Sequence, residues 1–580
     1  MTGGPVSGDR SAKYAVVPGE LLARVQGTTD GRAPDRVART RRPIITPIAH
    51  GGWDRAWYRP AVTEAAVVPA MGGMSDAGTT ARDRPARRWW LLLALFLAVG
   101  LGIRLWYLFA CLHPAKVIGD PLYYHQAANL FASGRGWPDP YELNINHRYV
   151  ADAQHPPLTS ALLALPSLVG LTSFLDHQIS ECLLGTLAIF FVALTGRRAA
   201  GPAAGLVAAA IAAVYPGMWI NDPLVMSETT GILACSVLLW LAYRYWERRG
   251  YLDAALLGAS AAAAALARAE LLLLALFLVT PLILLARPRA GPGGRLASWR
   301  RAVALLVTAA AACVLAIAPW AVYNLTRFHQ PEYLSTGLGT TLAVTTCDQT
   351  YSGPALGFWD FDCVLEIPNP PTERSDRDVF YRKAAYAYLG AHERELPKVA
   401  LARAGRTWGL FHPFQQLQLD TIELRPIRVS QVGLGSLWVL MAAGGAGAVV
   451  LRRRRSLLLP LVALPGALTI ASTMVYGTSR FRAVAEPAVV LLAAVAFAAV
   501  RGRFVPRGRH SGARPPAIPL ARPELAPTAE PAMPSPVGDL TVPLRPGRLG
   551  LPAGAGDGSP SASTGPAPDG GAAQLPAEVT

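Results

Sequence analysis

The stretch WWLLLALFLAVGLGIRLWYLFACL, residues 89–112, decides the class of fold. It carries one charged residue, Arg104, in a run of mainly apolar side chains. The hydrocarbon core of a bilayer is about 30 Å thick, and a helix needs roughly 20 consecutive apolar residues to cross it. Residues 89–112 therefore predict a membrane-spanning helix, in which Arg104 needs an acidic partner or access to the membrane surface.

Further apolar runs of similar length follow this one. Only 16% of the residues are charged and 52% are hydrophobic, whereas soluble domains carry about 25% charged residues. The sequence therefore predicts an all-α, polytopic membrane protein of about ten transmembrane helices. The predicted spans are 89–112, 178–195, 201–220, 223–243, 252–268, 271–287, 302–321, 431–451, 456–476 and 483–500.

One short segment decides the orientation of these spans. Residues 155–170 are apolar but few, and they open with His155-Pro156-Pro157. If this segment lies along the surface as a juxtamembrane helix, all the basic clusters fall on one side, as the positive-inside rule requires. We therefore expect a multi-pass protein of the plasma membrane with both termini in the cytoplasm. The clusters are Arg84/Arg87/Arg88, Arg197/Arg198, Arg244/Arg248/Arg249, Arg287 to Arg301, Arg452 to Arg455 and Arg501/Arg503/Arg507.

The two ends of the chain differ from its middle. Residues 1–87 are polar, and residues 501–580 are rich in Pro, Ala, Gly and Ser, so both are predicted to be disordered cytoplasmic segments around a membrane domain at 88–500. The sequence leaves open whether the protein begins at Met1, Met71 or Met74. The net charge of +16 comes from clusters between spans, which indicates contact with membrane lipids rather than with nucleic acid.

This orientation places most of the polar chemistry outside. The outer parts are a loop at about 113–176, a large loop at about 323–430, and short turns near Glu228, Arg268 and Arg480. In the first loop, the spacing after Asp120 predicts a short amphipathic helix at the membrane interface. Asp120 could cap that helix, a purely structural role that stands beside a functional one.

Several short motifs occur in a fixed order along the chain, relative to the spans. Together they resemble the GT-C membrane glycosyltransferases, whose members include protein O-mannosyltransferases and the aminoarabinose transferases of lipid A. The resemblance covers residues 88–500. The motifs are Asp120 with Tyr124 and the following Ala127, Leu130, Gly134 and Gly136; His155-Pro156-Pro157-Leu158; Ser227-Glu228; Arg268-Ala269-Glu270; Pro319-Trp320 with Asn324; and Arg480-Phe481-Arg482 with Glu486-Pro487.

The resemblance implies transfer of a sugar from a polyprenyl phosphate to a glycan, lipid or protein acceptor on the outer face of the membrane. Asp120 matches the catalytic Asp of the family. A carboxylate suits this place because an acceptor hydroxyl is a poor nucleophile until a base takes its proton. The phosphate leaving group then needs cationic or metal stabilisation rather than an acid.

Other site residues follow from the same resemblance. Tyr124 matches a Tyr lining the site, and Glu228 matches a second acid that, with Asp120, is a candidate holder of a divalent metal. His155 stands where some relatives have Lys, and Pro121 where most have Glu, so metal dependence and acceptor class stay open. The substrate-binding candidates are Tyr124, His155, Glu228, Arg268, Glu270 and Arg480.

Simpler roles compete with these assignments. Arg268 and Glu270 could pair with each other at a span junction. Arg480 could snorkel to the interface instead of binding phosphate through its guanidinium. Glu228 could be a solvated helix end.

The large outer loop carries its own features. Cys347 and Cys363 lie on the oxidising side of the membrane, and we expect them to form a disulfide rather than two free thiols. Cys and His residues show no spacing typical of a structural zinc site. Helical periodicity between 371 and 425 places a set of side chains on one face, namely Tyr381, Ala384, Ala385, Tyr388 and Leu389.

Two other classes of function compete with a glycosyltransferase. A membrane transporter or lipid flippase tends to place charges near the bilayer midplane. The acids of this chain lie at span ends or in loops, which favours chemistry at the interface. The third class is an assembly component that keeps the fold without activity. Arabinose, mannose, glucose and galacturonate donors all stay open.

Overall fold

The computed structural model describes residues 79–112, 119–287 and 294–504. This part of the chain is helical apart from loops, and its one extended pairing is an isolated bridge between Pro138 and Ala151. The predicted all-α class is therefore confirmed. The two segments predicted to be disordered lie outside the described residues, except for 79–87 and 501–504, which are helical.

A helical segment coincides with each predicted span. Among the described residues, four helices are long and apolar enough to cross a membrane, within α2, α6, α11 and α18. The chain is therefore a polytopic membrane protein, while the number ten stays a prediction. The segments are α2 (Thr79–Ala110), α6 (Phe174–Ala200), α7 (Pro202–Val214), α8 (Ser227–Arg248), α9 (Tyr251–Ala267), the series η3 (Ala269–Leu272), η4 (Ala275–Val279) and α10 (Thr280–Leu285), α11 (Gly294–Leu325), α18 (Ile427–Arg453), α19 (Leu459–Met474) and α21 (Glu486–Phe504).

The predicted span 201–220 was too long. Helix α7 ends at Val214, and the chain continues through two 3₁₀ turns, η1 (Pro216–Met218) and η2 (Asp222–Leu224). Proline explains the break, because it has no N–H to donate and its ring clashes with the preceding turn. The break turns Asp222 toward Arg104, and the two buried side chains pair at 2.6 Å.

Close helix packing holds the long helices together. A Cβ on Gly258 of α9 would lie 1.9 Å from the carbonyl oxygen of Ala309 in α11, and one on Gly447 of α18 would lie 1.8 Å from that of Leu492 in α21. At both places the helix backbones touch, so only glycine fits. Small residues that let helices approach closely are typical of membrane helix interfaces.

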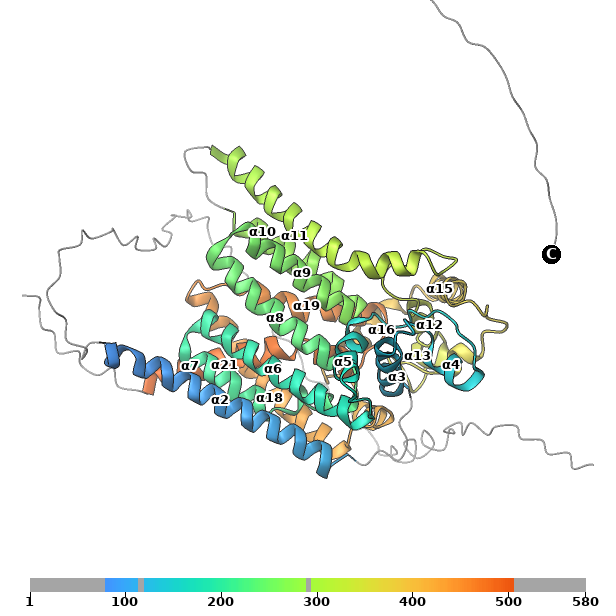
Figure 1. The fold of residues 1–580 in the computed structure, drawn as a ribbon, viewed down its shortest axis with the longest axis horizontal. Coiled ribbons are helices and arrows are strands. Elements are labelled where there is room, and N and C mark those ends of the chain that lie inside the picture. The colour runs from blue at the N-terminus through green and yellow to red at the C-terminus, as the bar shows by residue number, and fades with distance from the viewer. Residues whose placement is uncertain (1–78, 113–118, 288–293, 505–580) are drawn as a thin grey trace, which may run out of the picture. The chain divides into compact units, whose positions relative to one another are not determined.

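Short helices gather at one end of the long ones, among them α3, α4, α12, α13 and α15 (Figure 1). The helices predicted after Asp120 and within 155–170 are both present, as α3 and α5. In α15, Tyr381 and Ala385 of the predicted face are buried. The short elements are α3 (Asp120–Ala132), α4 (Pro140–Asn146), α5 (Leu158–Leu168), α12 (Leu338–Ala343), α13 (Asp348–Tyr351), α14 (Asp362–Leu365), α15 (Arg374–Ala391), α16 (Leu396–Thr407), α17 (Pro413–Leu419), η5 (Asp420–Glu423) and α20 (Ser479–Ala483).

The described basic clusters meet at the other end of the long helices. Arg197, at the end of α6, lies over the ring of Trp89 near the start of α2. Its neighbour Arg198 pairs with Glu247 near the end of α8. Arg301 in α11 donates to the carbonyl of Arg249. The structure thus gathers these basic residues at one end, as expected if one side of the membrane faces the cytoplasm.

Candidate active site

Asp120 is the first residue of α3, and it follows Gly119, whose φ of +68° lies in the left-handed region that favours glycine. No side chain caps this helix. The Asp120 carboxylate instead accepts from Nη2 of Arg480 at 2.7 Å and lies 3.5 Å from Nε2 of His155. Its contacts therefore link it to other elements, and it does not have the capping role considered above.

Arg480 is the centre of the site. It lies in α20, where the side chain of Thr478 caps the helix. Besides Asp120, its guanidinium donates from Nε to Glu228 at 2.5 Å and from Nη1 to Glu423 at 3.3 Å. One arginine thereby joins α3, α8, η5 and α20, which lie far apart in the sequence.

A second arginine extends the cluster. Arg268 follows α9 and donates from Nη1 to Glu228 at 2.8 Å and from Nε to Glu270 at 2.7 Å. Glu228 is fully buried between Arg268 and Arg480. It is therefore not a solvated helix end, and Arg268 binds both acids rather than Glu270 alone.

Tyr124 and His155 form an aromatic wall beside Asp120. Their rings lie 5.1 Å apart, and the ring of Tyr123 lies 4.8 Å from that of His155. Tyr124 is almost fully buried, and burial together with the nearby Asp120 raises the pKa of its hydroxyl. The structure thus brings together all seven residues singled out from the sequence: Asp120, Tyr124, His155, Glu228, Arg268, Glu270 and Arg480.

The charges of the cluster determine how Asp120 ionises. Burial raises the pKa of the Asp120 carboxyl, but Arg480 and then His155 outweigh it and hold the pKa well below its ordinary value. Burial likewise acts against the charge of Arg480, but Glu228, Glu423 and Asp120 together raise its pKa far above the usual range. Asp120 is therefore a carboxylate and Arg480 a cation at neutral pH.

Two residues that contact the site, Glu423 and Tyr141, were not singled out from the sequence. Glu423 in η5 is the third carboxylate on Arg480, and burial raises the pKa of its carboxyl against the opposing effect of Arg480. Tyr141 in α4 donates its hydroxyl to the carbonyl of Gly119 at 2.6 Å, just before Asp120. The signal for Glu423 was available, because Glu423-Leu424-Arg425 precedes a span with the same charge spacing as Arg268-Ala269-Glu270.

A second ion cluster ties α3 to the large loop. The hydroxyl of Tyr123 donates to Asp152 at 2.6 Å, and Asp152 lies 3.7 Å from Nε of Arg374 at the start of α15. Arg374 also pairs with Asp139, which caps α4 by accepting from the backbone N–H groups of Tyr141 and Glu142. The position of α3, and with it Asp120, therefore depends on the large loop.

The candidate metal pair has an arginine between its two acids. Asp120 and Glu228 each accept a hydrogen bond from Arg480, so the guanidinium stands where a shared metal ion would stand. Oε2 of Glu228 is buried without a hydrogen-bond partner. The pair therefore does not fit a divalent ion with Arg480 in this position. Elsewhere, His329, Glu373 and Asp376 place three ligand atoms within 4.8 Å of one another.

The predicted cysteine pair is joined in the large loop. Cys347 and Cys363 form a disulfide, which connects the start of α13 to α14. The four remaining cysteines are free thiols, and all but Cys111 are buried.

One family model matches part of the chain. Residues 154–323 match the family model described as dolichyl-phosphate-mannose-protein mannosyltransferase. This segment contains His155, Glu228, Arg268 and Glu270, whereas Asp120 and Arg480 lie outside it. No curated protein sequence matches the chain.

Several solved structures match the chain at low sequence identity and with TM-scores below 0.5. The oligosaccharyltransferase of Archaeoglobus fulgidus, solved with Zn and sulfate, shares 15% identity over 71% of this chain and 49% of its own, with a TM-score of 0.42. The oligosaccharyltransferase AglB from Archaeoglobus fulgidus, in complex with an inhibitory peptide and a dolichol-phosphate, shares 17% identity over 72% of this chain and 50% of its own, with a TM-score of 0.42. ArnT from Cupriavidus metallidurans, bound to undecaprenyl phosphate, shares 14% identity over 70% and 77%, at 0.35.

The chain spans about half the length of the archaeal enzyme. The resemblance to GT-C membrane glycosyltransferases that the motifs indicate is confirmed by the family model, over residues 154–323.

Proposed function

We propose that this protein transfers a sugar from a polyprenyl phosphate to an acceptor hydroxyl on the extracytoplasmic side of the membrane, with Asp120 as the general base. The observation that carries the proposal is the position of Asp120. It is a half-buried carboxylate held by Arg480 and His155. Asp120 lies at the end of the long helices that is opposite the basic clusters.

The chemistry follows from the site. The acceptor hydroxyl gives its proton to Asp120 as its oxygen forms a bond to the anomeric carbon of the sugar. The bond from that carbon to the phosphate oxygen breaks, and the lipid phosphate leaves with the electron pair. Cations near the leaving oxygen stabilise the charge that develops on it.

Arg480 also restrains the base. A carboxylate with a strongly depressed pKa is a weak base, because the best proton acceptor has a pKa near the working pH. A donor phosphate that competes for the Arg480 guanidinium weakens its hold on Asp120, which raises the pKa of the carboxyl. Donor binding thus prepares the base, and Asp120 takes the proton only when there is a sugar to transfer.

The test is sugar transfer by purified protein reconstituted in lipid, with a panel of polyprenyl-phosphate sugars. Wild type is compared with Asp120→Asn and with Glu366→Gln, an exposed acid of the large loop. Loss of the base lowers the rate by roughly 10²–10⁴-fold, with normal membrane abundance, and the control keeps the wild-type rate. Full activity of Asp120→Asn contradicts the assignment.

The same preparation separates the competing class of function. If no donor turns over while a labelled lipid crosses the bilayer, the protein is a transporter or flippase. The panel of donors also identifies the sugar.

A further inference from the structure

Two histidines outside the proposed active site lie against each other. His125 comes from α3 and His177 from the first turn of α6, and their Nδ1 atoms are 3.1 Å apart. His177 is fully buried, whereas His125 is partly exposed. Two imidazole nitrogens this close either share a hydrogen atom or can share a metal ion, and their surroundings show which lone pairs are available.

A chain of hydrogen bonds fixes the tautomer of His177. The carbonyl of Thr172 only accepts, so Asn129 turns its Nδ2 toward it at 3.0 Å and its Oδ1 toward Ser167. The hydroxyl of Ser167 donates to that Oδ1 at 2.7 Å. Its oxygen therefore accepts from Nε2–H of His177, at 2.9 Å. Since a neutral imidazole carries one N–H, Nδ1 of His177 has a free lone pair that faces His125.

This arrangement around His177 is typical of histidines that bind metals. In metal sites the second ring nitrogen donates to a neighbouring group, which fixes the tautomer and orients the ring. Ser167 in α5 accepts from His177 in this way, and Asn129 in α3 holds Ser167 in turn. The lone pair on Nδ1 is thus oriented before any ion binds.

The geometry of the pair also suits an ion. Two nitrogens that each lie about 2.0–2.1 Å from Zn²⁺ at a near-tetrahedral angle are about 3.3 Å apart, so the rings need to separate by only about 0.2 Å. The ring centroids are 4.8 Å apart and the ring planes meet at 66°, so the rings are not aligned end to end as in an ideal N–H···N hydrogen bond. His125 becomes a second ligand when it carries its proton on Nε2 instead of Nδ1.

We infer that His125 and His177 bind a divalent transition-metal ion of the Zn²⁺, Ni²⁺ or Cu²⁺ type through their Nδ1 atoms, with water completing the coordination on the exposed side of His125. Imidazole nitrogen suits these ions, whereas Mg²⁺ and Ca²⁺ prefer oxygen ligands. The bound ion joins α6 to α3, the helix that begins with Asp120.

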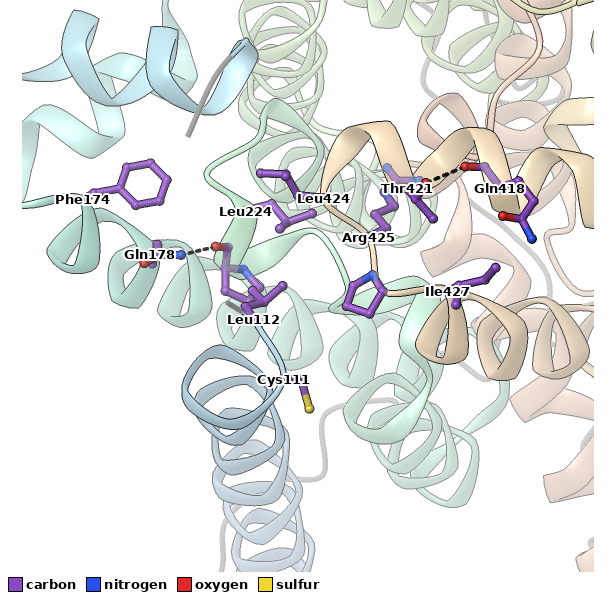
Figure 2. A pocket seen from close by; sticks show the side chains of 12 residues that line it. Cys111, Leu112, Phe174, Gln178, Leu224, Gln418, Thr421, Leu424, Arg425 and Ile427 are labelled. Atoms are coloured by element: carbon purple, nitrogen blue, oxygen red, sulfur yellow. Dashed lines mark hydrogen bonds between the residues drawn. The ribbon is translucent and has the colours of Figure 1, made fainter. Parts of the chain in front are cut away.

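The histidine pair is separate from the cavity that lies nearest to it. Phe174 packs edge-on against His125, with 5.3 Å between the ring centroids. The same Phe174 lines a cavity of about 430 Å³ together with Gln178 and Arg425 (Figure 2). The described residues that line this cavity include neither histidine, so an ion on the pair does not occupy it.

The test is Zn²⁺ binding to the purified full chain, stripped of metal with EDTA and measured by isothermal titration calorimetry at neutral pH. We expect a Zn²⁺ site that is lost in His125→Gln and in His177→Gln, because each removes a ligand. The matched control is His329→Gln, which removes the histidine of the exposed group with Glu373 and Asp376 and keeps this site. Mg²⁺ and Ca²⁺ are expected not to bind there.

A second pair of variants keeps both ligands and guards against misfolding. Ser167→Ala removes the acceptor that fixes the tautomer of His177, and loss of such a partner lowers metal affinity by roughly 10–100-fold. The matched control is Ser180→Ala in α6, whose hydroxyl donates to the carbonyl of Asp176, and it keeps wild-type affinity.

Three results overturn the inference: no Zn²⁺ binding by wild type, unchanged binding in both histidine variants, or Mg²⁺ binding as tightly as Zn²⁺. Loss of binding in His329→Gln alone places the ion in the large loop and overturns it as well. Wild-type affinity in Ser167→Ala contradicts the fixed tautomer. Since no donor or acceptor is present, these results do not depend on whether the protein transfers a sugar.

Discussion

At the scale of single residues, Arg480 explains how four segments of chain meet. Its planar guanidinium has donors on three nitrogens, and each faces a different carboxylate: Asp120, Glu228 and Glu423. Lysine has one compact ammonium and cannot reproduce this fork. The residue therefore organises the site as well as balancing its charge.

Replacing Arg480 by Gln leaves three carboxylates without their shared cation. Breaking a buried ion pair from one side costs about 3–5 kcal/mol, so we expect a clear loss of stability. Arg480→Lys keeps the charge and loses less. Thermal denaturation in detergent checks this, and melting temperatures of both variants equal to wild type would contradict the central role of Arg480.

Glu332 in the large loop predicts a pH dependence. Burial, and then Asp378, raise its pKa to about 7 despite Arg382. The folded state therefore prefers the protonated form, so this group's contribution to stability is present below the unfolded pKa of about 4.3 and is lost as the pH rises through 7. The loss is roughly 3–4 kcal/mol at most.

The variant Glu332→Gln removes the loss of stability that deprotonation of Glu332 causes at high pH. We expect it to raise the melting temperature at pH 8 and to change it little at pH 4.5. Arg382 keeps Asp378 as a partner at 2.7 Å. The control is Glu366→Gln, an exposed acid of the same loop, and a Glu332→Gln effect of equal size at both pH values would exclude titration of Glu332 as the cause.

At the scale of elements, the breaks between helices position side chains as much as the helices do. The break after α7 places Asp222 against Arg104, and a Cβ on Gly185 of α6 would lie 1.9 Å from Oδ2 of Asp222. The charge predicted to be costly in the first span thus finds a buried acid, supplied by a turn between two helices. Apolar periodicity carries no information about such a pairing.

Helix contacts give a second prediction at this scale. Gly258→Ala places a methyl group 1.9 Å from the Ala309 carbonyl oxygen, so α9 and α11 have to separate. Overpacking of this kind costs about 1–3 kcal/mol. Gly466→Ala in α19 meets nothing within 4 Å and serves as the control. Yield and melting temperature in detergent report the difference, and equal values for the two variants would rule out the close contact.

At the scale of the whole membrane domain, charge separates the two ends of the helices. Basic clusters meet at one end, and the proposed site occupies the other. Positive charge near the cytoplasmic surface is the usual arrangement, so the site is expected on the extracytoplasmic side.

Cysteine labelling in intact cells tests that orientation. In a Cys111→Ala background, Tyr386→Cys in α15 and Arg454→Cys after α18 place thiols at exposed positions on the two ends. We expect a membrane-impermeant maleimide to label position 386 and to reach position 454 only after the cells are opened. The reverse pattern would place the site in the cytoplasm.

The clustering of the candidate residues was largely predictable from sequence, because they lie at helix ends in motifs that follow the order of a known family. Asp120, Tyr124, His155, Glu228, Arg268, Glu270 and Arg480 do lie together. Arg425 was missed because it belongs to a long loop, whose course depends on contacts that no periodicity records. Glu423 was missed although its charge spacing with Arg425 resembles that of Arg268 and Glu270.

The sequence by itself determined the membrane class and most of the helical segments, and it predicted the side on which each basic cluster lies. Those properties follow from local hydrophobicity and charge, which the bilayer selects one segment at a time. Only the tertiary structure decided the partners: Arg480 with three carboxylates, Arg104 with Asp222, and Arg425 beside an apolar cavity. Pairing of this kind depends on how segments pack in three dimensions, and charges far apart in a sequence carry no record of which of them will be buried together.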